Sequence, residues 1–276
     1  MKEGMEKYFG GIQMAKKSAS YISVFPEIFQ DCIDSIKNSQ DKLMNKSVKE
    51  GFIDKHLNLL SLDYCDAAVG EFVLNSDLDK SKQYFYLSSK IQEYLFLKYD
   101  DKSIKVSPSF VTMNKYFKIL TALISDNNVL VNSLAKLIGG RTKEELENGH
   151  PFTDNVGYII KYIILEDYIL ARERIDLLEK AEDIKTKVFY RTYLKVLKGI
   201  LETDTDSVNN GLQSMLEDYK KVREYKDLPE ELFCIPVVGL AKLAVRQGIS
   251  VNIDDPIAPR IMIEKQNIIY PEFNLI

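Results

Sequence analysis

The residues that most often catalyse reactions or bind metals are few in this sequence and stand far apart. The chain has only two histidines, His56 and His150, and contains neither H-E-x-x-H nor C-x-x-C. A metal site needs His, Cys or carboxylate ligands that converge on one ion. His56 and Cys65 share one predicted helix, but nine residues separate them by about 13 Å along its axis. We therefore expect no metal site and no cofactor.

One acidic stretch partly matches a calcium loop. Asp204-Thr205-Asp206 is followed by Asn209 and Gly211, but Val208 stands at the fifth position and the glycine at the eighth instead of the sixth. Aspartates that cap a helix N-terminus explain this cluster better.

The motifs of nucleotide binding and of serine hydrolases are also absent from the sequence. Neither G-x-x-x-x-G-K-[ST] nor G-x-G-x-x-G occurs, and no G-x-S-x-G presents a serine. Asp63 and Asp66 lie on one predicted helix, where a solvated face explains them better than paired acid and base catalysis. One enzymatic alternative stays open: a hydrolase in which His56 or His150 meets a nucleophile and an acidic partner.

Composition indicates an ordinary globular chain with no affinity for nucleic acid or membranes. The 276 residues are 45% hydrophobic and 28% charged, with a net charge of -4 that does not favour binding to phosphate backbones. No apolar run approaches the ~18 residues of a membrane span, and the N-terminus lacks an apolar leader. Cys32, Cys65 and Cys234 are odd in number and widely separated, as expected for buried thiols in a reducing compartment. We therefore expect a cytoplasmic protein.

Helices must supply the framework, because apolar residues recur at spacings of three and four between few prolines and glycines. The clearest stripe runs from Val156 to Ala181. Similar patterns predict helices over 5–20, 27–45, 52–74, 77–99, 108–125, 128–138, 186–202, 206–225 and 229–247. The prediction is an all-α fold, an irregular array of about ten antiparallel helices.

Boundary signals agree with this list of helices. Ser107 precedes a proline at a helix start and Thr153 can cap the helix after Pro151. The pair Gly139-Gly140 and Gly248 end helices by entering the left-handed conformation. Weak alternation leaves β-structure open only at 249–253 and 266–270.

Helix pairing predicts tetratricopeptide-like hairpins in the C-terminal half. The helices at 187–202 and 208–225, joined by 203–206, have the length of one such hairpin, although no fixed period near 34 residues recurs. We expect one helical domain over 1–276, with a possible subdivision into 1–140 and 150–276.

The segment from Glu202 to Glu231 is locally acidic, with nine acidic and four basic residues. A run of this kind is usually a solvated helix face, but it also steers cationic partners towards itself.

The last third of the chain resembles the bacterial immunity 49 family. The matching features over 190–264 are Leu197-Lys198-Gly199-Ile200-Leu201, an acidic turn, the run from Cys234 to Ala244 with Arg246-Gln247-Gly248, and then Asp255-Pro256, Pro259-Arg260 and Ile261-Met262. These are packing and turn signals. Gly239, Ala241 and Ala244 allow a neighbouring helix to approach closely.

The resemblance implies a helical, non-catalytic immunity protein that binds and neutralises a cognate bacterial toxin. No catalytic residues transfer from the family. We expect a cationic toxin to meet the acidic segment, with two tyrosines as aromatic anchors. The predicted contact residues are Asp204, Asp206, Glu217, Asp218, Tyr219, Glu224, Tyr225 and Asp227. The alternative is a tetratricopeptide-like scaffold or regulatory module that holds a peptide or protein in a groove.

Overall fold

The computed structural model describes residues 18–180, 188–222 and 225–274, and this part of the chain is all-α, with twelve α-helices, four 3₁₀ helices and no β-strand. The α-helices are α2 (Ser18–Met44), α3 (Ile53–Asn75), α4 (Leu78–Asp101), α5 (Phe117–Ile124), α6 (Asn128–Leu137), α7 (Thr142–Asn148), α8 (Pro151–Ile164), α9 (Tyr168–Lys180), α11 (Val188–Glu202), α12 (Thr205–Tyr219), α13 (Ile235–Arg246) and α14 (Arg260–Ile263). The 3₁₀ helices are η1 (Glu50–Phe52), η2 (Pro108–Phe110), η3 (Met113–Tyr116) and η5 (Pro229–Glu231). No helix in these ranges has the length and apolar character needed to cross a bilayer.

Four helical hairpins, α3/α4, α5/α6, α8/α9 and α11/α12, share one kind of turn. In each, a non-glycine residue with a positive φ is followed by an Asp or Asn whose side chain accepts a hydrogen bond from the backbone N–H three residues later. The pairs are Ser76-Asp77, Asp126-Asn127, Glu166-Asp167 and Thr203-Asp204. These turns are unevenly spaced along the sequence, so a tetratricopeptide repeat is not confirmed.

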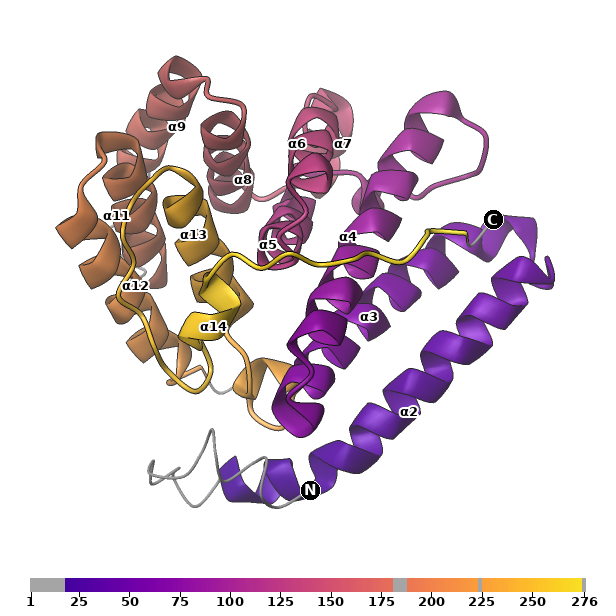
Figure 1. Ribbon diagram of the computed structural model, residues 1–276. Coiled ribbons are helices and arrows are strands. Elements are labelled where there is room, and N and C mark those ends of the chain that lie inside the picture. The colour runs from indigo at the N-terminus through magenta and orange to yellow at the C-terminus, as the bar shows by residue number, and fades with distance from the viewer. Residues whose placement is uncertain (1–17, 181–187, 223–224, 275–276) are drawn as a thin grey trace.

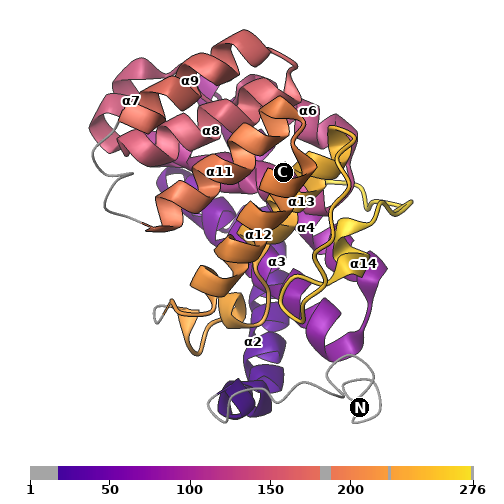
Figure 2. The same cartoon turned by 90° about the vertical axis from the view of Figure 1, so that its left-hand side faces the viewer.

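The helices follow an arc from α2 to α12, with α13 and α14 on its inner side (Figure 1). Turned by 90°, the molecule shows α8, α9, α11 and α12 side by side (Figure 2). Helix α13 is buried from Ile235 through Ala244. It approaches α5 so closely that a Cβ on Gly239 would lie 2.6 Å from the Leu120 Cβ. The close approach expected at Gly239 is confirmed, and α13 fills the interior of the arc.

The chain after α13 runs across the hairpins and is held to them by hydrogen bonds. Asn209 of α12 donates to the Ser250 carbonyl over 2.9 Å, and Gln83 of α4 donates to the Ile269 carbonyl over 2.8 Å. The Tyr270 hydroxyl donates to the Ser125 carbonyl over 2.6 Å. We call residues 264–273 the strap (yellow in Figure 1). No β-strand forms at 249–253 or 266–270, where the sequence had left one open; an isolated bridge joins Asp255 and Ala258.

Several predicted boundaries were wrong. The helix predicted from Val156 to Ala181 is two helices, α8 and α9, because Glu166 adopts a φ of 61°. Helix α7 was missed, and Thr153 lies inside α8 instead of capping it. Ser107 makes no side-chain capping hydrogen bond, although Pro108 does begin η2. The positive φ values expected at Gly139, Gly140 and Gly248 are confirmed. The helix predicted over 5–20 lies mostly outside the described residues.

Candidate functional site

The predicted contact residues divide between the two ends of α12 and the loop that follows it. Asp204 and Asp206 lie at the N-terminal end, and Glu217 and Asp218 lie at the other. Eleven residues of helix place Asp206 and Glu217 about 16 Å apart along the axis. Glu224 lies outside the described residues. The acidic segment is therefore an elongated surface with two separated groups of carboxylates.

Part of this negative charge already has a partner. The Asp204 carboxylate accepts from the Ser207 N–H over 3.0 Å and from the Ser207 hydroxyl over 2.7 Å, and these bonds lower its pKa. Asp218 pairs with Lys221 over 3.2 Å. Asp227 pairs with Lys226 over 3.4 Å. Asp204 is thus a helix cap, as the sequence indicated for this cluster.

The two predicted aromatic anchors differ in exposure. Tyr219 is only 4% exposed, and its hydroxyl donates to the Phe233 carbonyl over 3.5 Å. Burial raises its pKa well above the ordinary value. Tyr225 is half-buried and packs on Tyr219, with the ring centroids 4.5 Å apart. The expectation of an exposed anchor at Tyr219 was wrong, because its apolar ring completes the core beneath α12.

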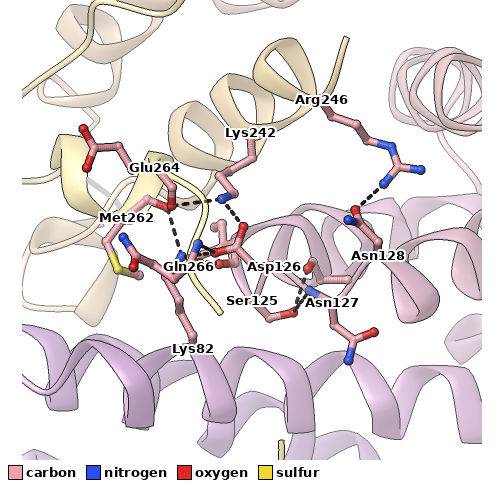
Figure 3. A network of polar contacts seen from close by, with 12 residues as sticks. Lys82, Ser125, Asp126, Asn127, Asn128, Lys242, Arg246, Met262, Glu264 and Gln266 are labelled. Carbon is pink, nitrogen blue, oxygen red and sulfur yellow. Dashed lines mark hydrogen bonds and ion pairs between the residues drawn. The ribbon is translucent and has the colours of Figure 1, made fainter. Parts of the chain in front are cut away.

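A buried charge cluster lies where α4, α13 and the α5/α6 turn meet the strap (Figure 3). One carboxylate, that of Asp126, serves two ammonium groups: Lys82 over 2.6 Å, and Lys242. Lys82 also donates to the Ile124 carbonyl over 3.0 Å, and the Gln266 N–H donates to Asp126 over 3.1 Å. Burial, and after it the charge of Lys242, lowers the pKa of Lys82 to about 8. This cluster fixes the strap and three helical elements to one point.

A second buried polar network joins α3, α4 and α5. Lys118 donates to the Ser88 hydroxyl over 2.8 Å and to the Ser61 carbonyl over 3.2 Å. A lysine beside a serine is a pairing that some hydrolases use for nucleophilic attack, but Ser88 is 0% exposed. The network is therefore sealed from substrate, and burial lowers the pKa of Lys118.

The other residues considered for chemistry are dispersed. His56 lies on α3, and His150 precedes α8. The three cysteines are free thiols whose pKa burial raises, which does not favour thiolate chemistry. Within the described ranges, no three His, Cys, Asp or Glu residues gather in a way that could hold a metal ion.

Asp63 and Asp66 are more enclosed than a solvated face implies. Asp63 accepts from the Ser35 hydroxyl over 2.7 Å. Burial, and after it the charge of Glu230 on η5, raises the pKa of Asp66 to about 7. Sequence patterns could not predict this arrangement, because Glu230 lies 164 positions from Asp66 and their elements, η5 and α3, pack together only in the folded chain.

Comparisons with protein-family models, curated proteins and solved structures find no match to this chain. The resemblance to the immunity 49 family therefore rests on the residues of 190–264.

Proposed function

We propose that this protein is an immunity protein that binds a cognate bacterial toxin and blocks it by covering its active surface, without catalysis by the immunity protein itself. The observation that carries the proposal is the exposed surface formed by the C-terminal end of α12 and by η5. Glu217 and Asp227 are exposed there, and Leu228 is 44% exposed. Tyr225, packed on Tyr219, holds this loop against the helix. Apolar and acidic groups side by side suit a partner that is both apolar and basic.

The resemblance supports the same proposal through packing. Gly199 and Gly239 both belong to the resembling segment and both lie at close helix contacts. A Cβ on Gly199 would lie 3.0 Å from a Val208 methyl group, and one on Gly239 would press on Leu120. The helices on either side of the exposed loop, α12 and α13, are thus each packed closely against a neighbouring helix. The peptide-holding scaffold has less support, because α13 fills the inner side of the arc.

Coexpression tests the proposal most directly. The proposed toxin is the product of the gene adjacent to the one that encodes this chain. Cells that express this product should survive when this chain is coexpressed, and the two proteins should copurify as a complex. Absence of both rescue and copurification would contradict the proposal.

Charge reversal then tests the surface. A variant with Glu217, Asp218, Glu224 and Asp227 changed to lysine should associate with a cationic toxin at least tenfold more slowly at low salt, because steering by opposite charge is lost. The difference should shrink at high salt. The matched control reverses four exposed acids elsewhere, Asp41, Asp79, Glu147 and Glu173. Equal association rates for the two variants would exclude the surface.

A further inference from the structure

The strap contacts α4 in the way that an extended peptide contacts a protein surface. After α14, the described chain forms neither helix nor strand, and the strap extends from α14 towards α4 (yellow in Figure 1). Its side chains alternate: Gln266, Ile268 and Tyr270 are half-buried, whereas Asn267 and Ile269 are exposed. An extended segment shows this alternation when one of its sides lies on a surface. The strap therefore has the geometry of a bound peptide.

Two aromatic pairs anchor the strap to one face of α4. The ring centroids of Tyr86 and Tyr270 lie 4.6 Å apart, and those of Tyr94 and Phe273 lie 6.0 Å apart. Tyr86 and Tyr94 are eight positions apart and Gln83 precedes Tyr86 by three, so the three residues share a helix face. We call Gln83, Tyr86 and Tyr94 the strap face. Aromatic pairs of this kind favour an aromatic residue at both anchor positions of the strap.

Other contacts bind the strap through its backbone. The Gln83 side-chain amide donates to the Ile269 carbonyl over 2.8 Å. The Asp126 carboxylate accepts from the Gln266 N–H over 3.1 Å (Figure 3). These bonds set the position of the strap along α4, and the two aromatic pairs then select its sequence. The contacts thus specify an occupant with this spacing of aromatic residues.

The strap can leave α4 without opening the buried charge cluster. A hinge lies at Glu264 and Lys265, which are both exposed. On the other side of this hinge α14 is held in place, because Met262 is 0% exposed and its carbonyl accepts from Lys82 over 3.3 Å. Release of the strap breaks one N–H bond to Asp126 but leaves both ion pairs of this carboxylate.

We propose that two copies of this protein exchange straps, so that the strap of one copy lies on the strap face of the other. A second copy is the occupant that the contacts specify most completely, because its strap has the same sequence and forms every contact that is formed within one chain. Only the hinge changes conformation. The fraction of exchanged dimer depends on the chain concentration relative to the effective concentration of the chain's own strap. The inference goes beyond the proposed function and does not rest on it.

Two complementary variants of the full chain test the exchange. Tyr270→Ala/Phe273→Ala disables the strap and leaves the strap face intact, whereas Tyr86→Ala/Tyr94→Ala disables the face and leaves the strap intact. Sedimentation velocity should find each variant monomeric on its own, because one lacks a strap that binds and the other lacks a face that accepts it. An equimolar mixture should form a heterodimer. A mixture of the two folded variants that stays monomeric would overturn the inference.

A matched control alters the exposed side of the strap. Asn267→Ala/Ile269→Ala changes two side chains that face away from α4, and Ile269 is 87% exposed. When mixed with Tyr86→Ala/Tyr94→Ala, this control should associate about tenfold more weakly than the strap-disabled variant does, because its own strap still covers its strap face. Equal association of the two mixtures would show that the strap face is not the binding surface.

Wild type supplies a second test that needs no variant to fold. Its dimer fraction should rise with concentration, and an excess of a peptide with the sequence of residues 264–274 should dissociate the dimer. The same peptide with alanine at the positions of Tyr270 and Phe273 should have no effect. A dimer that survives the strap peptide forms through another surface and overturns the exchange. A wild type that stays monomeric also overturns it, and binding of the peptide by that monomer would assign the strap face to a different partner.

Discussion

Asp126 is the residue on which the buried charge cluster depends. Its single carboxylate faces two ammonium groups, so this cluster holds one positive charge more than it holds negative charge. Breaking a buried pair by removing one partner is far more costly than losing a surface pair, because the remaining charge stays buried. Lys82 is 0% exposed, so its ammonium group depends on the partners inside the protein.

Changing Asp126 to Asn should therefore lower the free energy of unfolding by about 3 kcal/mol. Asparagine keeps the tolerance for a positive φ, so the turn itself is preserved. Urea titration monitored by circular dichroism measures the change. The control is Asp41→Asn, an exposed carboxylate on α2, which should stay within ~0.5 kcal/mol of wild type. Equal effects would show that the cluster adds no stability.

Asp66 predicts a pH dependence with the opposite sign to that of a salt-bridged acid. Its folded-state pKa of about 7 lies above the ordinary value of 3.8 because of burial, with a further contribution from Glu230 and Asp63 against the opposing charge of Lys118. Between these two values the folded protein keeps a proton that the unfolded chain releases. The stability contributed by this group is thus full below pH 4 and falls as pH rises to 7.

Asp66→Asn should remove that loss. Relative to wild type, the variant should gain on the order of 2 kcal/mol between pH 4 and pH 8, a figure that allows for partial access of water to the carboxylate. Parallel urea titrations at the two pH values measure it. A gain that is the same at both pH values would contradict the raised pKa.

The shared hairpin turn explains why four helix pairs form without glycine or proline in their connections. A left-handed non-glycine residue costs roughly 1–2 kcal/mol, and the Asx cap that follows offsets much of it by satisfying a free N–H of the next helix. The turn at 203–204 offers a matched pair of exposed aspartates for testing this balance.

Asp204→Ala should lower the free energy of unfolding by about 1 kcal/mol, because the cap to Ser207 is lost. Asp206→Ala removes the same charge from the same turn but no capping bond, and should change stability by less than ~0.5 kcal/mol. Thermal melts of both variants give the comparison. A larger loss at Asp206 would refute the capping role of Asp204.

The same turn shows what the sequence could predict and what it could not. Helix periodicity identified most helices because the core faces are long and regular. The prediction from periodicity merged α8 and α9 into one helix, because the apolar stripe continues on both sides of Glu166 and no glycine or proline marks the break. The acidic turn at Asp204 was recognised as a cap, and the same pattern at Asp167 would have located the break. Lys118, a lone charge within the apolar run Phe117–Ile124, was a signal for the buried network.

The whole molecule depends on α13 as its central packing element. The fold class was predictable, but the position of α13 inside the arc was not, because periodicity describes one helix at a time and contains no information on which helices meet. Its contacts with α5 pass through Gly239, where a Cβ would lie 3.1 Å from the Leu120 Cα. A backbone atom cannot move aside as a side chain can.

Gly239→Ala should therefore destabilise the protein by about 1–3 kcal/mol, although alanine is the better helix former. The control is Gly51→Ala, where a Cβ would meet nothing within 4 Å, and its effect should be no more than ~0.5 kcal/mol. Differential scanning calorimetry on both variants measures the contrast. A stabilised Gly239→Ala variant would show that α13 and α5 can separate without loss.

The bond from Lys82 to the Met262 carbonyl joins positions 180 residues apart. During synthesis the early hairpins can form as they emerge, yet this lysine keeps its water shell until the segment around Met262 arrives. Closure of the interior is thus deferred to a late, long-range event of the slow kind that distant contacts impose. Until then the nascent protein carries a hydrated ammonium group, that of Lys82, at a position that is fully buried in the folded protein.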